Sequence, residues 1–187
     1  DGTYILPSAR AELALGSGVT AFAENAPTLR SPSLDGLYGT NPYAEHAPSL
    51  RPTVFTTNAA AGLSASLGPV RLQTEAGFRY APSYQFFVSP LTSSSTLAET
   101  AFEVGYGSAR ILRGGGQVAL QGIDGVEASL DAFVRDGQLV GPDAAIPYFS
   151  PVVTRAMLSV SFLDDKALLQ TTGTIESPRP LNPGSDR

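Results

Sequence analysis

The sequence predicts an all-β fold, an antiparallel up-and-down transmembrane β-barrel of which about eight strands are present. The clearest observation is segment 70–80, where Val70, Leu72 and Phe78 alternate with polar residues such as Arg71 and Glu75. Successive strand side chains point to opposite faces, so this strand has one apolar and one polar face. Its alternation holds for about eleven residues, the length that a tilted strand needs to cross a bilayer. Strands of soluble sandwiches usually end near five or six residues.

The same alternation recurs along the chain. We expect strands at 7–15, 19–24, 56–67, 70–80, 99–121, 126–135, 154–162 and 167–176. Tight turns at 16–18, 68–69, 122–125 and 164–166 alternate with long loops at about 25–54, 81–97 and 136–151. Short turns at one end and long loops at the other are typical of outer-membrane barrels. Uneven loops also occur in soluble sandwiches, so a soluble extracellular β-sandwich that binds partners stays open as an alternative.

Segment 99–121 allows two interpretations. It is either one long strand that bulges at Gly114–Gly116 or two strands with a turn near Gly107 and Ser108. Glycine in a strand interior often marks a bulge, which favours the first interpretation. We expect residues 1–178 to form one partial barrel and residues 179–187 to form an irregular tail.

Composition excludes several classes of protein. The chain has 187 residues, a net charge of -5, a single lysine and no cysteine. It contains no apolar run long enough for a membrane helix, so any crossing must use strands. Its scattered basic residues give no electrostatic footprint for nucleic acid. The opening residues do not resemble a signal peptide, so we expect that one was removed or that the chain is an internal piece.

No residue pattern predicts catalysis, a cofactor or a metal site. His46 is the single histidine and lies in a loop, without a Gly-x-Ser-x-Gly elbow to supply a nucleophile. Asp164 and Asp165 are interpreted as turn residues. The glycines at 114–116 lack the Lys-Ser/Thr that would complete a phosphate-binding loop. We therefore expect a protein that is not an enzyme.

Four motifs resemble TonB-dependent outer-membrane receptors. An aromatic strand end in Phe22-Ala23-Glu24-Asn25 precedes the Arg-x-Pro-Ser of Leu29-Arg30-Ser31-Pro32-Ser33, and Leu37-Tyr38 follows. Leu50-Arg51-Pro52 is similar to the Leu-x-Pro-Glu of that family, with Thr53 in place of Glu. Ala109-Arg110-Ile111-Leu112-Arg113-Gly114 is similar to its Asn-Ala-Arg-Ile-x-Gly strand, and Ala145-Ile146-Pro147-Tyr148-Phe149-Ser150-Pro151 to its Pro-x-x-Pro strand start. The motifs occur in the family's order and cover most of the chain.

The resemblance implies a 22-stranded barrel in the bacterial outer membrane that imports iron chelates, vitamin B12 or other nutrients. It implies contact with membrane lipid, with a TonB-type energising protein through a plug domain, and with the remaining barrel strands or other envelope proteins. The plug, the TonB box and the terminal aromatic strand of the family are missing from this sequence. We therefore expect the chain to be part of a larger barrel.

Two groups of residues are candidates for a functional role. Polar side chains of the alternating strands are expected to face the lumen: Arg71, Gln73, Glu75, Glu127, Asp131 and Arg135. Loop residues are expected to contact a ligand or partner: Arg30, Tyr38, Tyr43, Tyr84, Phe86 and Phe87. For the aromatic ones, packing of the loops or a place at the membrane interface is the alternative. The predicted function is nutrient or siderophore uptake, and the alternative is a non-transporting barrel that serves as a structural or interaction subunit of an envelope complex.

Overall fold

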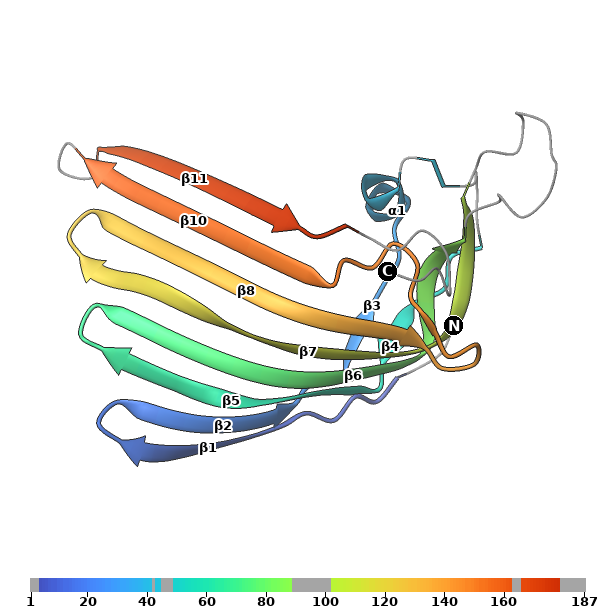
Figure 1. Cartoon of the computed structure of the whole chain (residues 1–187), viewed down its shortest axis with the longest axis horizontal. Coiled ribbons are helices and arrows are strands. Elements are labelled where there is room, and N and C mark those ends of the chain that lie inside the picture. Colours follow the sequence, from blue (N-terminus) through green and yellow to red (C-terminus); the bar gives the residue numbers. More distant parts are fainter. Residues whose placement is uncertain (1–3, 42, 45–48, 89–101, 163–165, 179–187) are drawn as a thin grey trace.

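One large antiparallel sheet dominates the computed structural model, which describes residues 4–41, 43–44, 49–88, 102–162 and 166–178 (Figure 1). Each long strand pairs with the next long strand along the chain, which confirms the predicted antiparallel all-β, up-and-down fold. In spatial order these strands are β1 (Ala9–Gly16), β2 (Val19–Asn25), β5 (Thr57–Leu67), β6 (Val70–Val88), β7 (Glu103–Ile123), β8 (Val126–Leu139), β10 (Val152–Phe162) and β11 (Ala167–Glu176). The short β9 (Ala144–Ala145) pairs with β8.

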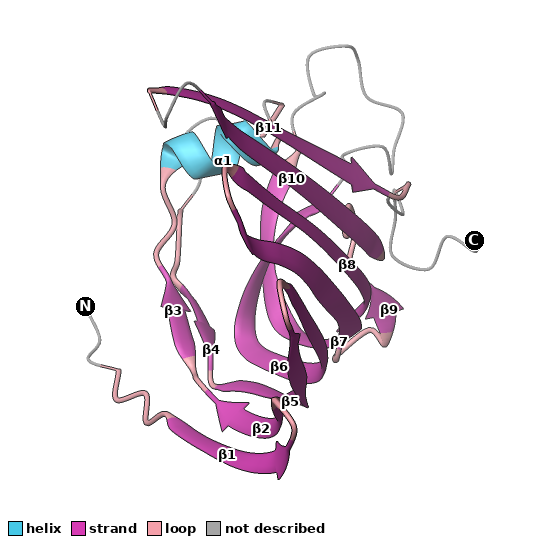
Figure 2. Ribbon diagram, turned by 90° about the vertical axis from the view of Figure 1, so that its left-hand side faces the viewer, coloured by secondary structure: helices cyan, strands magenta, loops and turns pink. Residues whose placement is uncertain are grey.

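The sheet curves into an open trough (Figure 2). Within the described residues β1 and β11 each pair on one side only, so they form the two edges of the sheet. The turns β1–β2, β5–β6, β7–β8 and β10–β11 lie together at one end (Figure 1). At the other end lie α1 (Leu34–Thr40) and the small sheet of β3 (Thr28–Arg30) and β4 (Thr53–Phe55). The short turns and the long connections therefore lie at opposite ends of the sheet.

The two faces of the sheet differ sharply. Directly opposed residues of an antiparallel pair point to the same face, so the register assigns every side chain to the inner, concave face or to the outer face. Large apolar side chains on the outer face are exposed: Leu13, Leu63, Leu67, Phe78, Leu112, Val118, Leu130, Val134, Val152, Leu158, Phe162, Leu169 and Ile175. Most buried apolar residues of the long strands are on the inner face: Phe22, Ala60, Ala81, Ala109, Ile111, Ala119, Leu139 and Val153. Phe87, near the end of β6, is buried on the other face.

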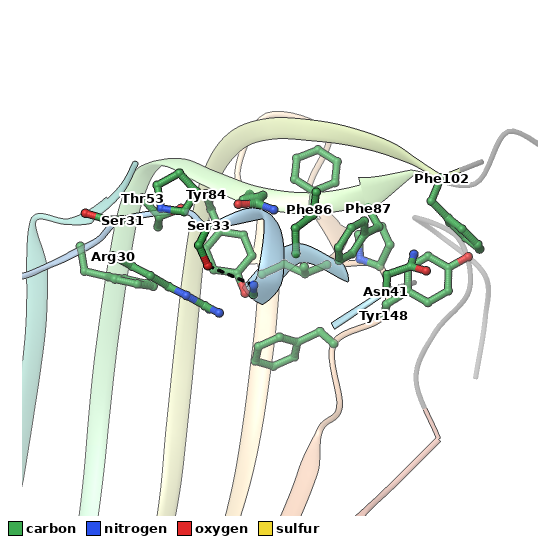
Figure 3. A pocket seen from close by; sticks show the side chains of 18 of the residues that line it. Arg30, Ser31, Ser33, Asn41, Thr53, Tyr84, Phe86, Phe87, Phe102 and Tyr148 are labelled. Atoms are coloured by element: carbon green, nitrogen blue, oxygen red, sulfur yellow. Dashed lines mark hydrogen bonds between the residues drawn. The ribbon is translucent and has the colours of Figure 1, made fainter. Parts of the chain in front are cut away.

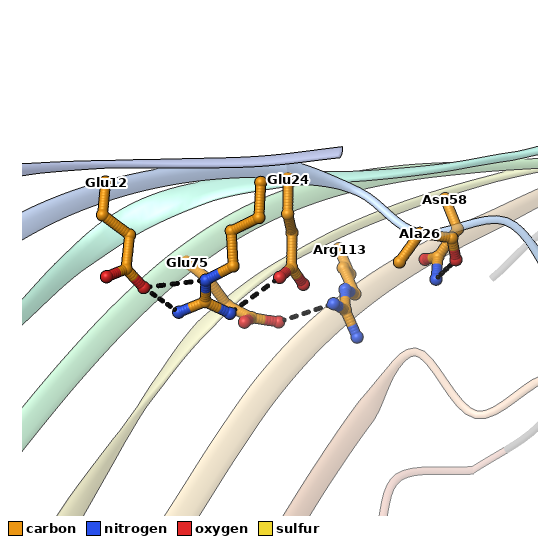
Figure 4. Close-up of polar contacts among 7 residues, drawn as sticks. Glu12, Glu24, Ala26, Asn58, Glu75 and Arg113 are labelled. Atoms are coloured by element: carbon orange, nitrogen blue, oxygen red, sulfur yellow. Dashed lines mark hydrogen bonds and ion pairs between the residues drawn. The ribbon is translucent and has the colours of Figure 1, made fainter. Parts of the chain in front are cut away.

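Charged side chains pair across strands on the inner face (Figure 4). The Arg10 guanidinium lies 2.9 Å from the Glu24 carboxylate on the neighbouring strand, and Arg113 lies 2.9 Å from Glu75. Asn58 donates from Nδ2 to the Ala26 carbonyl at 2.8 Å. The inner face therefore carries the charged pairs of the sheet, together with apolar residues such as Phe22 and Val153.

The hairpin of β6 and β7 extends beyond the rest of the sheet, which corrects the expectation of a loop from residue 81. The register shifts between Ala81 and Tyr84, because one extra β6 residue is inserted there, and pairing then continues to Val88. Pro82, within this bulge, interrupts the period of two and hides the strand from sequence analysis. The remainder of the expected loop, from 89, lies outside the described residues.

Three further expectations are corrected. β8 runs to Leu139, four residues past the predicted end. The region expected as a loop at 25–54 contains α1, β3 and β4, of which α1 begins where the Ser33 hydroxyl accepts a hydrogen bond from Gly36 N at 3.0 Å. Residues 103–123 form one strand, but Gly114–Gly116 pair without a bulge, and the shift on β7 lies between Leu120 and Ile123. His46, residues 99–101, residues 164 and 165 of the expected turn, and the tail from 179 lie outside the described residues.

The glycines of β7 are places of close approach between strands. A Cβ at Gly115 would lie 2.1 Å from the Ala132 carbonyl oxygen and 2.8 Å from the Phe133 ring. A Cβ at Gly114 would have its nearest contact 4.0 Å away, at the Glu75 carbonyl oxygen. The absence of a side chain is therefore needed at the first position and not at the second.

We predict that Gly115→Ala destabilises the fold by about 1–3 kcal/mol, the usual cost of forcing extra volume into a packed position. Gly114→Ala, the adjacent control, is expected to change stability by less than about 0.5 kcal/mol. Urea unfolding of the detergent-solubilised protein, followed by circular dichroism, measures both. Equal losses from the two substitutions would contradict the close approach at Gly115.

Candidate functional site

A pocket of about 440 Å³ opens at the loop end of the sheet (Figure 3). Three parts of the chain surround it: the β6–β7 extension, the α1 region with β3 and β4, and the segment 146–149. Its lining is rich in aromatic rings: Tyr43, Phe55, Tyr84, Phe86, Phe87, Phe102, Tyr148 and Phe149. A cavity of this size and composition is typical of a small-molecule site.

The β6–β7 extension carries aromatic residues on both of its faces. Phe86 packs with Tyr84 on the cluster of Ala109 and Leu139, whereas Phe87 packs with Leu37 of α1. The Phe86 ring lies directly over β7, since a Cβ at Gly105 would be 2.8 Å from it. The extension is thus covered on both faces, unlike the outer face of the rest of the sheet.

Segment 146–149 forms the opposite wall of the pocket. Ile146 is only 2% exposed and packs in the same cluster as Ala109, Ile111 and Leu139. Its backbone N–H donates to the Gly137 carbonyl at 2.9 Å. A Cβ at Gly137 would lie 3.0 Å from the side chain of Ile146 and from the Phe149 ring. Close approach to a glycine therefore anchors this wall on β8.

Edge-to-face ring contacts fix the walls relative to one another. The Phe102 and Tyr148 centroids are 5.2 Å apart at an interplanar angle of 89°. The Phe55 and Tyr84 centroids are 6.1 Å apart at 69°. Such geometry is favoured by the ring quadrupoles and links the two walls of the pocket.

Arginines give this end of the sheet a positive field. Arg30 lines the pocket, and no carboxylate does so within the described residues. The Arg79 guanidinium lies 5.9 Å from the Phe55 ring centroid, and that of Arg135 lies 4.8 Å from the Phe149 centroid. Arg135 also donates to the Ser150 carbonyl, with the Nη2 donor at 2.8 Å.

Burial raises the pKa of the Tyr84 phenol, and the fields of Arg30, Arg135 and Arg79 lower it to a smaller extent. Desolvation disfavours the phenolate, so Tyr84 stays protonated at neutral pH. It therefore presents a neutral ring and a hydroxyl, not a negative charge, to the pocket.

The structure brings five of the six predicted loop residues together. Arg30, Tyr43, Tyr84, Phe86 and Phe87 line the pocket. Tyr38 packs instead against the cluster of Leu37, Ala44 and Phe87. Sequence reasoning missed Phe55, Phe102 and the 146–149 wall as site residues, although the residues 145–151 had been noted as a motif.

The six polar residues expected to face the lumen lie on the inner face of the sheet. They are Arg71, Gln73, Glu75, Glu127, Asp131 and Arg135, by their register with β5, β7, β8 and β10. Among them Glu75 pairs with Arg113, a partner that was not anticipated. No group of three metal-ligating side chains occurs within the described part of the chain. No helix in that part is long and apolar enough to span a membrane.

Comparison with solved structures identifies outer-membrane β-barrels as structural neighbours. The copper transporter OprC aligns with a TM-score of 0.55 at 16% identity, over 83% of this chain and 24% of that one. The FrpB iron transporter from Neisseria meningitidis aligns with a TM-score of 0.46 at 13% identity, over 90% of this chain and 26% of that one. No protein-family model and no curated protein matches the sequence.

The fold is therefore an antiparallel up-and-down sheet like that of outer-membrane β-barrels, and within the described residues the sheet is not closed. At this identity the likeness concerns the fold alone. The chain spans about a quarter of the length of either transporter.

We predict that Ile146→Ala lowers the free energy of unfolding by about 2–5 kcal/mol, because it empties a fully buried position. Val140→Ala is the matched control, since Val140 is 44% exposed. That substitution should cost less than about 1 kcal/mol. Chemical unfolding in detergent measures both, and similar values would contradict the packing of the pocket wall.

Proposed function

We propose that this chain forms a sector of a bacterial outer-membrane β-barrel that takes up a small ligand at its loop end. The observation that carries the proposal is the distribution of its side chains, which is the reverse of that in a soluble sandwich. Large apolar residues are exposed on the outer face, whereas the polar inner face is partly covered. A soluble sandwich buries its apolar face against a second sheet. An outer face of this kind suits lipid as its solvent.

The extent of the apolar face supports a membrane-spanning band. On β6 it runs from Val70 to Tyr80. The ten rises between these two residues, about 3.3 Å each and tilted by about 40°, span about 25 Å, the usual height of the apolar band of such barrels.

Polar outer-face residues begin where this band ends. Arg110 Nε donates to Gln138 Oε1 at 3.0 Å, and Arg110 Nη2 lies 3.2 Å from the Asp143 carboxylate. Arg110 is directly opposite Tyr80, the last apolar position of the band. The β6 bulge and the two-sided packing of the hairpin follow immediately. We assign the level of Arg110 and Gln138 to the outer boundary between the membrane and water, which places the pocket outside the bilayer.

The remaining parts of the proposal follow from this orientation. The inner-face residues Arg71, Gln73, Glu75, Glu127, Asp131 and Arg135 face an aqueous lumen. The edges β1 and β11 need partners, because lipid cannot hydrogen-bond to their backbone groups. Remaining barrel strands would supply these partners, and a TonB-type protein acting through a plug would energise uptake.

Fractionation of cells tests the location. The protein should appear in the outer-membrane fraction, resist extraction by carbonate and require detergent to stay monodisperse. Recovery as a monodisperse species in plain buffer would contradict the membrane assignment and favour a soluble sandwich.

An uptake assay distinguishes a transporter from a structural subunit. Loss of ligand uptake in cells that lack the TonB-type energising protein, with the barrel still present, is the expected result. An intact envelope assembly that depends on the barrel, together with unchanged uptake when the barrel is removed, would favour the structural subunit instead.

We predict that Leu130→Arg costs about 2–4 kcal/mol, the penalty for a cation at the bilayer midplane. Ser129→Arg is the matched control, since Ser129 neighbours Leu130 in sequence and lies on the inner face. Its cost should be less than about 1 kcal/mol. Unfolding of the protein reconstituted in lipid vesicles gives both values, and equal costs would contradict the assignment of the two faces.

A further inference from the structure

The charge of the loop-end pocket points to the class of its ligand. Arg30 is the one charged residue among the described residues that line it. Figure 3 shows its side chain extending from β3 into the pocket. Within the described part of the chain Arg30 has no hydrogen-bond or ion-pair partner, while Arg10, Arg110 and Arg113 all have carboxylates near them.

Two further guanidiniums reinforce this field from behind the aromatic wall. Arg79 and Arg135 lie over the rings of Phe55 and Phe149, both of which line the pocket. Their charges act on the same space, since both influence Tyr84 together with Arg30. A pocket lined by one guanidinium and backed by two more favours an anion over a bare metal cation.

The walls determine the shape of the rest of the ligand. The pocket is flanked by flat rings held edge to face, which accept a planar ring by stacking. Apart from Arg30, the hydrogen-bonding side chains of the lining are neutral, and the Ser33 hydroxyl already accepts a hydrogen bond from Gly36 N. An apolar aromatic body with one anionic group fits this combination.

We propose that the pocket binds a metal-free aromatic carboxylate, with the carboxylate paired to Arg30 and the ring held between the aromatic walls. This inference rests on the proposed function and names the ligand class of its loop-end site. It differs from binding of a bare cation, for which the described residues supply neither a ligand cluster nor a negative field.

Three probes of nearly equal shape test the charge: benzoate, neutral benzamide and cationic benzamidine. Saturation-transfer NMR on the intact protein in lipid nanodiscs, with empty nanodiscs as the blank, measures their binding. The expected order of affinity is benzoate, then benzamide, then benzamidine, and added salt should weaken benzoate only. Equal affinities, or tightest binding of benzamidine, would overturn the proposal.

Paired variants test the residues. Arg30→Gln should weaken benzoate by about tenfold or more, as expected for loss of a charge-assisted hydrogen bond, and leave benzamide unchanged. Arg51→Gln is the matched control, because the Arg51 guanidinium is stacked 5.8 Å from the Tyr106 ring centroid and Arg51 does not line the pocket. Phe102→Leu should weaken all three probes alike. An Arg30→Gln variant that binds benzoate as tightly as Arg51→Gln would overturn the assignment.

Failure of this inference can be told apart from failure of the proposed function. A protein found in the outer membrane that does not bind benzoate refutes the ligand class and leaves the barrel intact. A protein that is soluble without detergent yet binds benzoate through Arg30 supports the ligand class and refutes the membrane location.

Discussion

The backbone hydrogen bonding of an antiparallel meander, combined with two unlike faces, is the constraint on which the rest of this structure depends. Each strand between the two edges satisfies its donors and acceptors through the strands that precede and follow it in the sheet, so the sheet forms without any covering layer. The outer face is then free to carry exposed Leu, Val and Phe, and the inner face to carry ion pairs such as Glu75 with Arg113. In water this arrangement would expose a large apolar surface, and in lipid it would not.

The pocket depends on a local departure from that regular sheet. Beyond the bulge after Ala81, the β6–β7 hairpin leaves the curve of the sheet and is packed on both faces by loop-end residues. Segment 146–149 can approach β8 closely because Gly137 has no side chain. The aromatic lining is therefore built from three parts of the chain that are distant in sequence, and its positive field comes from arginines on β3, β6 and β8.

The regular strands were predictable from sequence, because alternation is a local property that each strand carries by itself. Segments 19–24 and 167–176 illustrate this, with bounds at or within one residue of those observed. Strand 81–88 was missed because Pro82 and the bulge break the period, and α1 because seven residues are too few to show a helical one. Tyr84, Phe86 and Phe87 stood out as loop aromatics, but Ile146 and Phe149 reach the pocket through long-range packing that no local pattern records.

The central claim is that the outer face of the sheet contacts lipid and the inner face contacts water. Since this chain has no cysteine, spin labels can be attached at single introduced cysteines on neighbouring positions of opposite faces, Gln117 with Val118 and Met157 with Leu158. In lipid vesicles, oxygen should relax the labels at 118 and 158 more strongly, and a water-soluble nickel chelate those at 117 and 157. Equal access of the nickel chelate to both members of each pair would contradict the account.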